Sequence, residues 1–404
     1  MLILSIDQAR AGMKLAAPVV HPEQPDQDLL KPGYVLEDKV LLRLRELGID
    51  HLYVDYPGLD DLDRHLAANL SPARQKLYSQ IKETIVAGQK RTRPAVSYTD
   101  YYATTRELVL TLMSQGEHPV YLEHMSRMGD DAVTHATAVA HLGLLLGIKL
   151  ELYLIEQRSR LPAKHAREVV NIGVGGMLHD MGKLALPQEL RQYNCLNPPT
   201  DPQQRNEWET HAQRGYDMIR GGVEPSAAIA VLNHHQRWDG LGFPALSLKD
   251  QQPQRPAEQN IHVFARIIAI ADLYDRLASP ADGSPRRSNV EVLHLMRTTY
   301  GSWCDPTVLK ALEAVAPPFP PGLTVTLSDG GGAVVVQVPP DDPYRPIVRR
   351  IVGADLELDS RRLDLRREES IRITHVGKTA VQQFVPAAQQ PAAARPARAA
   401  AAAA

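Results

Sequence analysis

The sequence predicts a mainly helical protein with a small N-terminal α/β module and a short C-terminal β extension. Three observations lead to this fold class. Residues 120–316 carry apolar side chains at helical spacing, residues 1–56 contain strand-like segments, and strand patterns return after "APPFPPG" at 316–322. The 404 residues are enough for two or three ordinary domains.

Composition excludes several classes of protein. The formal net charge of −2 predicts no general attraction to a nucleic acid polymer or an anionic membrane. The two cysteines, Cys195 and Cys304, are too few and too far apart for a disulfide scaffold. The start lacks the basic region and apolar run of a secretion signal. Lys149 and Glu151 interrupt the longest apolar segment, so we expect no membrane span and a cytoplasmic protein.

The N-terminal module, residues 1–56, is expected to mix strands with one helix. The segments "MKLAAPVV" (13–20) and "HLYVDY" (51–56) are typical of strands. Between them, "DKVLLRLRELGI" (38–49) has helical spacing, and Gly48 is expected to end the helix.

Residues 57–119 predict a helical connector. Its two helical stretches are 71–90 and 101–115. They are interpreted either as plain surface helices or as helices coiled against each other or against a second subunit, which would give a homodimer.

The C-terminal extension, residues 317–384, predicts β structure. "TVTLSDGGGAVVVQV" (324–338) indicates two strands around a glycine-rich turn, and "RPIVRRIV" (345–352) indicates a third. The low-complexity Ala/Pro tail, 385–404, is expected to be disordered.

The central segment, 120–316, contains many metal-capable side chains in apolar helical surroundings. In chain order they are His135, His179, Asp180, His211, His234, His235 and Asp272. Asp131 lies four residues before His135 and shares its helix face. Each residue alone is more often a hydrogen-bonded core residue. So many buried histidines and aspartates, however, can hardly satisfy one another's hydrogen-bonding groups. A cluster of divalent ions would remove the cost of burying them all.

The ligand types restrict the metal and suggest its chemistry. Imidazole and carboxylate without thiolate suit iron, manganese, zinc, cobalt or nickel. A bridging carboxylate such as Asp180 would let two ions share one water and lower its pKa, which gives a hydroxide nucleophile. Such a centre suits attack on phosphorus, and Lys183, one turn beyond Asp180, is placed to contact a phosphate oxygen. A surface lysine is the alternative for Lys183.

These motifs together resemble the HD-GYP family, a branch of the HD metal-dependent phosphohydrolases. The resemblance rests on "LHDMGKLALP", then His211, then "HHQRWDGLGFP", then "ARIIAIADLYDRL", in that order. It covers residues 120–316. The segments "IDQARAGMKLAAPVV" and "ELGIDHLYVD" are similar to a small module that often precedes such domains, and the strands after Pro317 resemble a β extension of some members.

The resemblance implies an all-helical domain with two or three divalent metal ions, most often iron or manganese. It also implies hydrolysis of the bacterial second messenger cyclic di-GMP, or a related cyclic dinucleotide, to pGpG or GMP. The positions that match the family's metal ligands are His135, His179, Asp180, His211, His234, His235 and Asp272. Asp131 matches the glutamate of three-metal members, and Lys183 matches a lysine that contacts the scissile phosphate. Arg286 and Arg287 lie close to the positions where the family has basic residues that bind the second phosphate.

The sequence departs from the family pattern at several places. Phe243, expected at the substrate, replaces the signature tyrosine, and Gln236 stands where glutamate is common. Asp131 is one methylene shorter than glutamate, which puts a third metal in doubt. No primary ligand is lost, so an active phosphodiesterase is expected. A weakly active or inactive cyclic-dinucleotide-binding module, a changed dinucleotide preference, and hydrolysis of another phosphoester remain as alternatives, the last ranked lowest.

Overall fold

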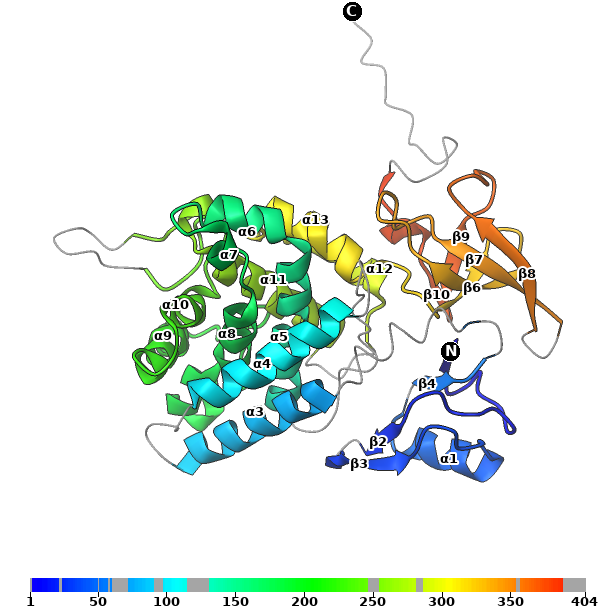
Figure 1. Ribbon diagram of the computed structural model, residues 1–404, viewed down its shortest axis with the longest axis horizontal. Coiled ribbons are helices and arrows are strands. Elements are labelled where there is room, and N and C mark those ends of the chain that lie inside the picture. The colour runs from blue at the N-terminus through cyan, green and yellow to red at the C-terminus, as the bar shows by residue number, and fades with distance from the viewer. Residues whose placement is uncertain are drawn as a thin grey trace, which may run out of the picture.

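The computed structural model describes residues 2–21, 24–49, 51–56, 59, 72–90, 97–114, 131–245, 254–280, 286–353 and 357–387. Figure 1 shows a large helical domain, a small N-terminal module and a C-terminal sheet, with both β-containing parts on the same side of the helices. The mainly helical fold class with β-containing ends is confirmed.

The N-terminal module pairs its first and last strands. Strand β1 (Leu2–Ser5) runs antiparallel to β4 (His51–Val54), and β2 (Val19–His21) pairs with β3 (Gln24–Leu30). Helix α1 (Asp38–Glu46) buries Leu41 and Leu44 beneath them. Gly48 follows α1 with a φ of 73°, a left-handed conformation that favours glycine and ends a helix. The predicted helix and the strand near 51–56 are confirmed, whereas β1 and β3 were not predicted.

The two predicted connector helices are α3 (Pro72–Lys90) and α4 (Tyr98–Ser114). They pack against each other, and they also pack against the helices of the central domain. Leu77 and Ile81 of α3 and Leu108 and Leu112 of α4 are buried in the hydrophobic cluster of that domain. Both helices therefore contribute to its core.

The central domain is helical throughout the described residues. Its α-helices are α5 (Asp131–Lys149), α6 (Glu151–Gln157), α7 (Ala163–Ala166), α8 (Val170–Leu178), α9 (Pro202–Ile219), α10 (Pro225–Asn233), α11 (Val263–Ala278), α12 (Asn289–Thr298) and α13 (Pro306–Val315). Short 3₁₀ helices join them: η3 (Met181–Ala185), η4 (Gln188–Leu190), η5 (Glu258–Asn260) and η6 (Gly301–Trp303).

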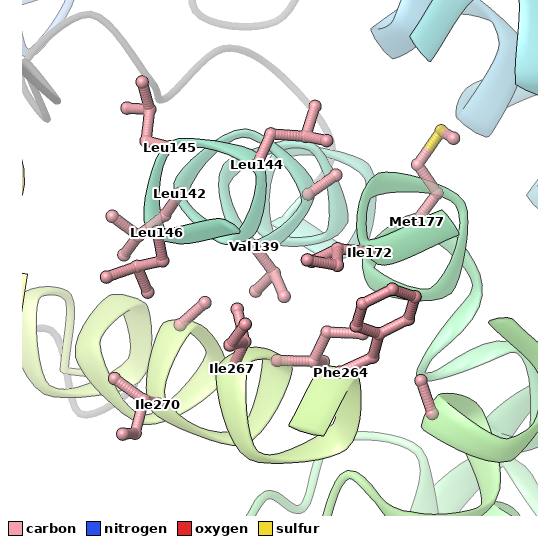
Figure 2. Packing of buried hydrophobic residues seen from close by; sticks show 14 of the residues in the cluster. Val139, Leu142, Leu144, Leu145, Leu146, Ile172, Met177, Phe264, Ile267 and Ile270 are labelled. Carbon is pink, nitrogen blue, oxygen red and sulfur yellow. The ribbon is translucent and has the colours of Figure 1, made fainter. Parts of the chain in front are cut away.

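Helices α5, α8 and α11 form the centre of this domain. Figure 2 shows Val139, Ile172 and Ile267, one from each helix, meeting between them. A methyl group on Gly176 of α8 would lie 2.9 Å from the Cα of Ala140 on α5, so glycine is required where the helices touch. This close approach brings the start of α5 and the end of α8 together.

Helix α5 is apolar on almost every side because it is surrounded by protein. Its residues 132–149 are long and apolar enough to cross a membrane, with a mean hydropathy of 1.3, but 83% of this window is buried inside the protein. The window is therefore accounted for as a core helix.

The C-terminal extension is one antiparallel sheet. Its strands are β5 (Thr324–Leu327), β6 (Gly332–Gln337), β7 (Ile347–Val352), β8 (Glu357–Asp364), β9 (Ile373–Val376) and β10 (Thr379–Ala380), in the order β10-β9-β5-β6-β7-β8. A 3₁₀ helix, η7 (Gln382–Phe384), follows. The three predicted strands are confirmed, and β8, β9 and β10 were not predicted. The predicted disordered tail lies, from residue 388 on, outside the described residues.

The N-terminal module and the C-terminal sheet are in direct contact. The amide of Ile3 donates to the carbonyl oxygen of Gly322 at 3.0 Å, and Val334 of β6 is buried in the core of the N-terminal module. On its other side the sheet's core includes Val290 of α12. The N-terminal module and the C-terminal sheet thus meet beside the helical domain (Figure 1).

Candidate metal centre

The pair His179–Asp180 lies where α8 ends. His179 is the C-cap of α8, and the chain continues from Asp180 directly into the 3₁₀ helix η3. The tight turn of η3 brings Lys183 back over the pair, with Nζ 2.7 Å from Oδ2 of Asp180.

The structure brings the seven predicted primary ligands together from separate elements. His135 comes from α5, His179 and Asp180 from the α8–η3 junction, His211 from α9, His234 and His235 from the end of α10, and Asp272 from α11. All five histidines and Asp272 are at most 8% exposed. Local helix signals support this placement, since Asp201 and Glu224 cap α9 and α10 and each is followed by a proline.

The ligands form two groups that share Asp180. One comprises Asp180, His211, His234 and His235, and the other His135, His179 and Asp180; within each group the ligand atoms lie within 4.8 Å of one another. The Oδ1 atom of Asp180 lies 3.6 Å from Nε2 of His211 and 3.8 Å from Nε2 of His234. Its Oδ2 atom lies 3.5 Å from Nε2 of His179. The carboxylate can therefore bridge two cations.

Asp272 completes the second group. Its Oδ1 atom lies 3.0 Å from Nε2 of His135, which in turn lies 3.2 Å from Nε2 of His179. We refer to the position between His135, His179, Asp180 and Asp272 as position A. The position between Asp180, His211, His234 and His235 is position B.

Four of the histidines are oriented by the nitrogen that faces away from the centre. The Nδ1 atoms of His179, His211 and His234 lie 2.6–2.7 Å from the carbonyl oxygen three residues earlier in the chain. Nδ1 of His135 lies 2.6 Å from Oδ2 of Asp275. In the neutral ring, each Nδ1 thus donates a proton to an acceptor and leaves the Nε2 lone pair facing the centre, as in metal-ligating histidines.

The centre contains buried acceptor atoms that a bound cation would satisfy. Oδ1 of Asp180 and Nε2 of His234 are buried without a hydrogen-bond partner among the described residues. Two Nε2 pairs also face each other, His135 with His179 at 3.2 Å and His211 with His235 at 3.1 Å. Burying such acceptors costs free energy unless a donor or a cation meets them. The donor set of neutral imidazole and carboxylate fits divalent first-row metal ions.

The protonation states also suit metal binding. Burial lowers the pKa of His179 and of His235, and it lowers the pKa of His211 to about 3, so these three imidazoles are neutral at pH 7. For Asp180, burial alone would raise the pKa, but Lys183 and His179 keep it well below its usual range. The pKa of Asp272 is likewise held low against burial, chiefly by His135.

His135 differs from the other histidines. Burial and Arg276 lower its pKa, but hydrogen bonds to Asp272 and Asp275 outweigh them and raise it. Without metal, this imidazole is the member of the centre that favours the charged form.

Sequence reasoning missed three polar residues of the centre. Asp275 orients His135, and Arg276 contacts both carboxylates, with Nη2 3.2 Å from Oδ2 of Asp180 and Nε 3.5 Å from Oδ1 of Asp272. Sγ of Cys195 lies 3.7 Å from Oδ2 of Asp272. The spacing of Asp275 and Arg276, three and four residues after Asp272, placed them on its helix face and could have identified them.

Phe243 lies beside position B. Its ring centroid is 4.6 Å from that of His235 and 5.2 Å from that of Trp208. These three rings line one pocket together with His234 and Asp272. Gln236 is buried, and its side chain donates to the carbonyl oxygen of Pro244 at 2.6 Å. This hydrogen bond holds the loop that carries Phe243.

The structure does not test the predicted roles of Asp131, Arg286 and Arg287. Asp131 begins α5, but its side chain lies outside the described residues. Arg287 donates to the carbonyl oxygen of Leu277 at 2.6 Å, at the end of α11, and Arg286 is half-buried next to it. Their contact with a second phosphate stays a prediction, as does the third metal at Asp131.

Comparison with known proteins found one family and several similar chains. Residues 152–308 match the family described as HD domain. A cyclic di-GMP phosphodiesterase of Pseudomonas aeruginosa is 27% identical over 333 residues, which are 76% of this chain and 74% of that protein. A cyclic di-GMP phosphodiesterase response regulator of Xanthomonas campestris is 30% identical over 150 residues, 36% of each. An HDG"Y"P protein from Bdellovibrio bacteriovorus superposes with a TM-score of 0.39 and 13% identity, over 77% of this chain and 97% of that chain.

Proposed function

We propose, on the premise that the chain contains an HD domain, that it is a metal-dependent phosphodiesterase that hydrolyses cyclic di-GMP to pGpG, GMP or both. The observation that carries the proposal is the pair of ligand groups that share Asp180. Two similar proteins are named as cyclic di-GMP phosphodiesterases, and one of these similarities extends over three quarters of this chain, which supports the choice of substrate.

The chain's own residues would hold two divalent ions, and iron and manganese are the proposed metals. Position A offers His135, His179, Asp180 and Asp272, and position B offers Asp180, His211, His234 and His235. When bound, such ions lower the pKa of a water and stabilise charge on a phosphoryl group.

The residues around these ligands have separate tasks. Lys183 holds an ammonium group at the edge of the centre, 12% exposed, where it can meet a non-bridging phosphate oxygen. Asp275 fixes the ring of His135. Trp208 and Phe243 form an apolar wall against His211 and His235, which keeps water from that side of position B.

The test combines metal analysis with an assay. Protein purified without oxygen is reconstituted with Fe²⁺ or Mn²⁺, its metal content is measured, and the products formed from cyclic di-GMP are separated. We expect about two ions per chain and release of pGpG or GMP. The Asp180→Asn variant keeps the side chain's shape but loses the bridging charge, so it should lose metal and at least about 100-fold in turnover. Full activity in this variant would overturn the proposal.

The matched control is Asp217→Asn. Asp217 lies on α9, the same helix as His211, but it is 44% exposed and pairs with Arg220 at the surface. This variant should keep both its metals and its rate.

The second candidate is a module that binds cyclic dinucleotides without turnover. The observation in its favour is Phe243, which stacks on His235 and has no hydroxyl to donate to a substrate. Metal-loaded protein that binds cyclic di-GMP but leaves it intact over long incubation would decide for this candidate. The same assay with a hybrid cyclic dinucleotide distinguishes changed substrate preference from absent turnover.

A further inference from the structure

Arg276 introduces a permanent positive charge into the metal centre. It lies on α11 one turn after Asp272, and its side chain is 18% exposed. The guanidinium contacts Oδ2 of Asp180 through Nη2 and lies near Oδ1 of Asp272 through Nε, at 3.2 and 3.5 Å. An arginine side chain keeps its proton at any physiological pH, so this charge cannot be switched off.

Arg276 makes its direct contacts at only one of the two metal positions. Both oxygens that it contacts face position A, because Oδ1 of Asp272 lies 3.0 Å from Nε2 of His135 and Oδ2 of Asp180 lies 3.5 Å from Nε2 of His179. The other oxygen of Asp180 faces position B.

Position B has the opposite character. Oδ1 of Asp180 has no hydrogen-bond partner among the described residues, and neither has Nε2 of His234. These two atoms lie 3.8 Å apart, and Nε2 of His211 lies 3.6 Å from the same oxygen. A cation that enters position B therefore meets these two partnerless acceptors, beside the Nε2 atoms of His211 and His235, which lie 3.1 Å apart.

We propose that Arg276 makes the two metal positions unequal, so that a divalent ion fills position B first and position A only at a higher metal concentration. An ion in position A must share both carboxylate oxygens with the guanidinium, and like charges this close repel. An ion in position B shares none of its oxygens with Arg276. The protein would then exist in a one-metal and a two-metal form, with the metal supply setting the proportion.

This inference requires that the centre binds metal, but it does not depend on cyclic di-GMP as the substrate. Its test therefore uses bound metal alone. Metal-free protein is dialysed against a series of free Mn²⁺ concentrations, and the bound Mn²⁺ is measured at each. We expect two steps, one ion per chain in each, separated by at least about tenfold in concentration.

Two ligand variants identify which position fills in each step. His211→Gln removes a ligand of position B, so it should remove or weaken the first step. His135→Gln removes a ligand of position A and should leave the first step in place while the second disappears. Loss of the first step in His135→Gln would overturn the proposed order.

The role of Arg276 is tested by a pair of substitutions. Arg276→Gln removes the charge, so the second step should move at least about tenfold toward the first. Arg276→Lys keeps the charge and should keep two separated steps. The control is Arg220→Gln, which removes a surface arginine that pairs with Asp217 and is 62% exposed; its curve should match the wild type.

The outcomes are decisive even if Arg276→Gln does not fold. A wild-type protein that fills both positions in one step contradicts the proposal. So does a folded Arg276→Gln variant, confirmed by its circular dichroism, that keeps the wild-type separation. Absence of cyclic di-GMP hydrolysis together with two separated Mn²⁺ steps would reject the proposed function and leave this inference standing.

Discussion

The ammonium group of Lys183 lies 2.7 Å from Oδ2 of Asp180, while the other oxygen of the same carboxylate has no hydrogen-bond partner among the described residues. The first oxygen is thus neutralised by a side chain, and the second faces His211 and His234. This arrangement follows from η3, whose tight turn puts residues three apart on one side. It separates the two proposed tasks: Asp180 holds metal, and Lys183 meets the substrate.

The first prediction concerns Lys183. Replacing it with methionine keeps most of the side-chain volume and removes the charge. Turnover of cyclic di-GMP should fall by about 10²–10³-fold, the usual cost of losing one group that stabilises transition-state charge. At saturating metal the metal content should stay close to that of the wild type, because all the metal ligands remain. Steady-state kinetics and elemental analysis of the same preparation check both points.

The control for this variant is Lys164→Met, at an exposed position on α7. Loss of metal from Lys183→Met, as large as the loss from Asp180→Asn, would show that the lysine only supports the carboxylate.

The second prediction concerns Gly182, where η3 touches α9. A Cβ atom here would overlap the carbonyl oxygen of His211 and lie 2.6 Å from the amide nitrogen of Gly215. Gly182→Ala must therefore push η3 away from α9 and separate Asp180 from His211. We expect a loss of about 1–3 kcal/mol in the free energy of unfolding, together with a loss of bound metal.

Urea unfolding and metal analysis test this prediction. The matched control is Gly222→Ala, whose Cβ would be 3.4 Å from the nearest atom, the carbonyl oxygen of Ile219. It should be close to neutral. Equal effects of the two substitutions would show that backbone freedom, not the contact with α9, requires glycine at 182.

The third prediction concerns pH and His262, which lies outside the metal centre at the start of α11. Its Nδ1 atom accepts a hydrogen bond from the amide of Phe264, so the ring must be neutral to cap the helix. Burial, together with Arg158 and Arg266, lowers the pKa of His262 to about 4. An unfolded histidine has a pKa of about 6.5, so between these values the unfolded chain binds the extra proton.

Stability should therefore fall as the pH falls through this window. The contribution of His262 is about 1.4 kcal/mol for each pH unit. His262→Asn keeps an acceptor for the cap but does not titrate. Between about pH 6.5 and 5, its free energy of unfolding should therefore fall less than that of the wild type, by about 1.4 kcal/mol for each pH unit. Urea unfolding of metal-free protein at several pH values measures this, and identical slopes for the two proteins would contradict it.

The fourth prediction compares two aspartates with the same local sequence. Asp201 and Asp305 each precede a proline and cap a helix, α9 and α13. Asp305 is also buried and accepts from Arg266 at 2.5 Å and from the hydroxyl of Tyr153 at 2.7 Å. Asp305→Ala leaves Arg266 unpaired in the core and should cost about 3–5 kcal/mol.

Asp201→Ala removes only an exposed cap and should cost about 1 kcal/mol. The free energies of unfolding of both variants give the comparison directly. A similar cost at the two sites would mean that the buried ion pair adds nothing beyond the cap.

Much of the candidate metal centre could be predicted from sequence because its histidines and aspartates stand out locally. A histidine or aspartate among aliphatic neighbours on a helix is conspicuous wherever it occurs. The order of "LHDMGKLALP", His211 and "HHQRWDGLGFP" led to the resemblance to HD-GYP proteins, and residues 152–308 match the HD domain. The predicted strands at 324–338 and 345–352 were likewise marked by apolar residues and a glycine-rich turn.

Other features gave weak local signals. Strands β1, β3 and β8 are short or polar, and β1 gains its partners from β4 and from Gly322, far along the chain. The connector helices α3 and α4 contain apolar residues whose partners lie on α5 and α8. Such contacts depend on which surfaces meet, and local spacing does not specify that.

The sequence by itself determined the helical domain, the β-containing ends and the chemical type of the centre, because periodicity and buried polar side chains are local properties. Only the tertiary structure decided which oxygen of Asp180 meets Lys183 and Arg276 and which one stays unpaired. It likewise decided that Asp305 neutralises a buried arginine, whereas Asp201 is exposed and caps α9. These outcomes depend on distances of a few ångströms between residues as much as 96 positions apart in the chain, and those distances are set by packing of the whole core.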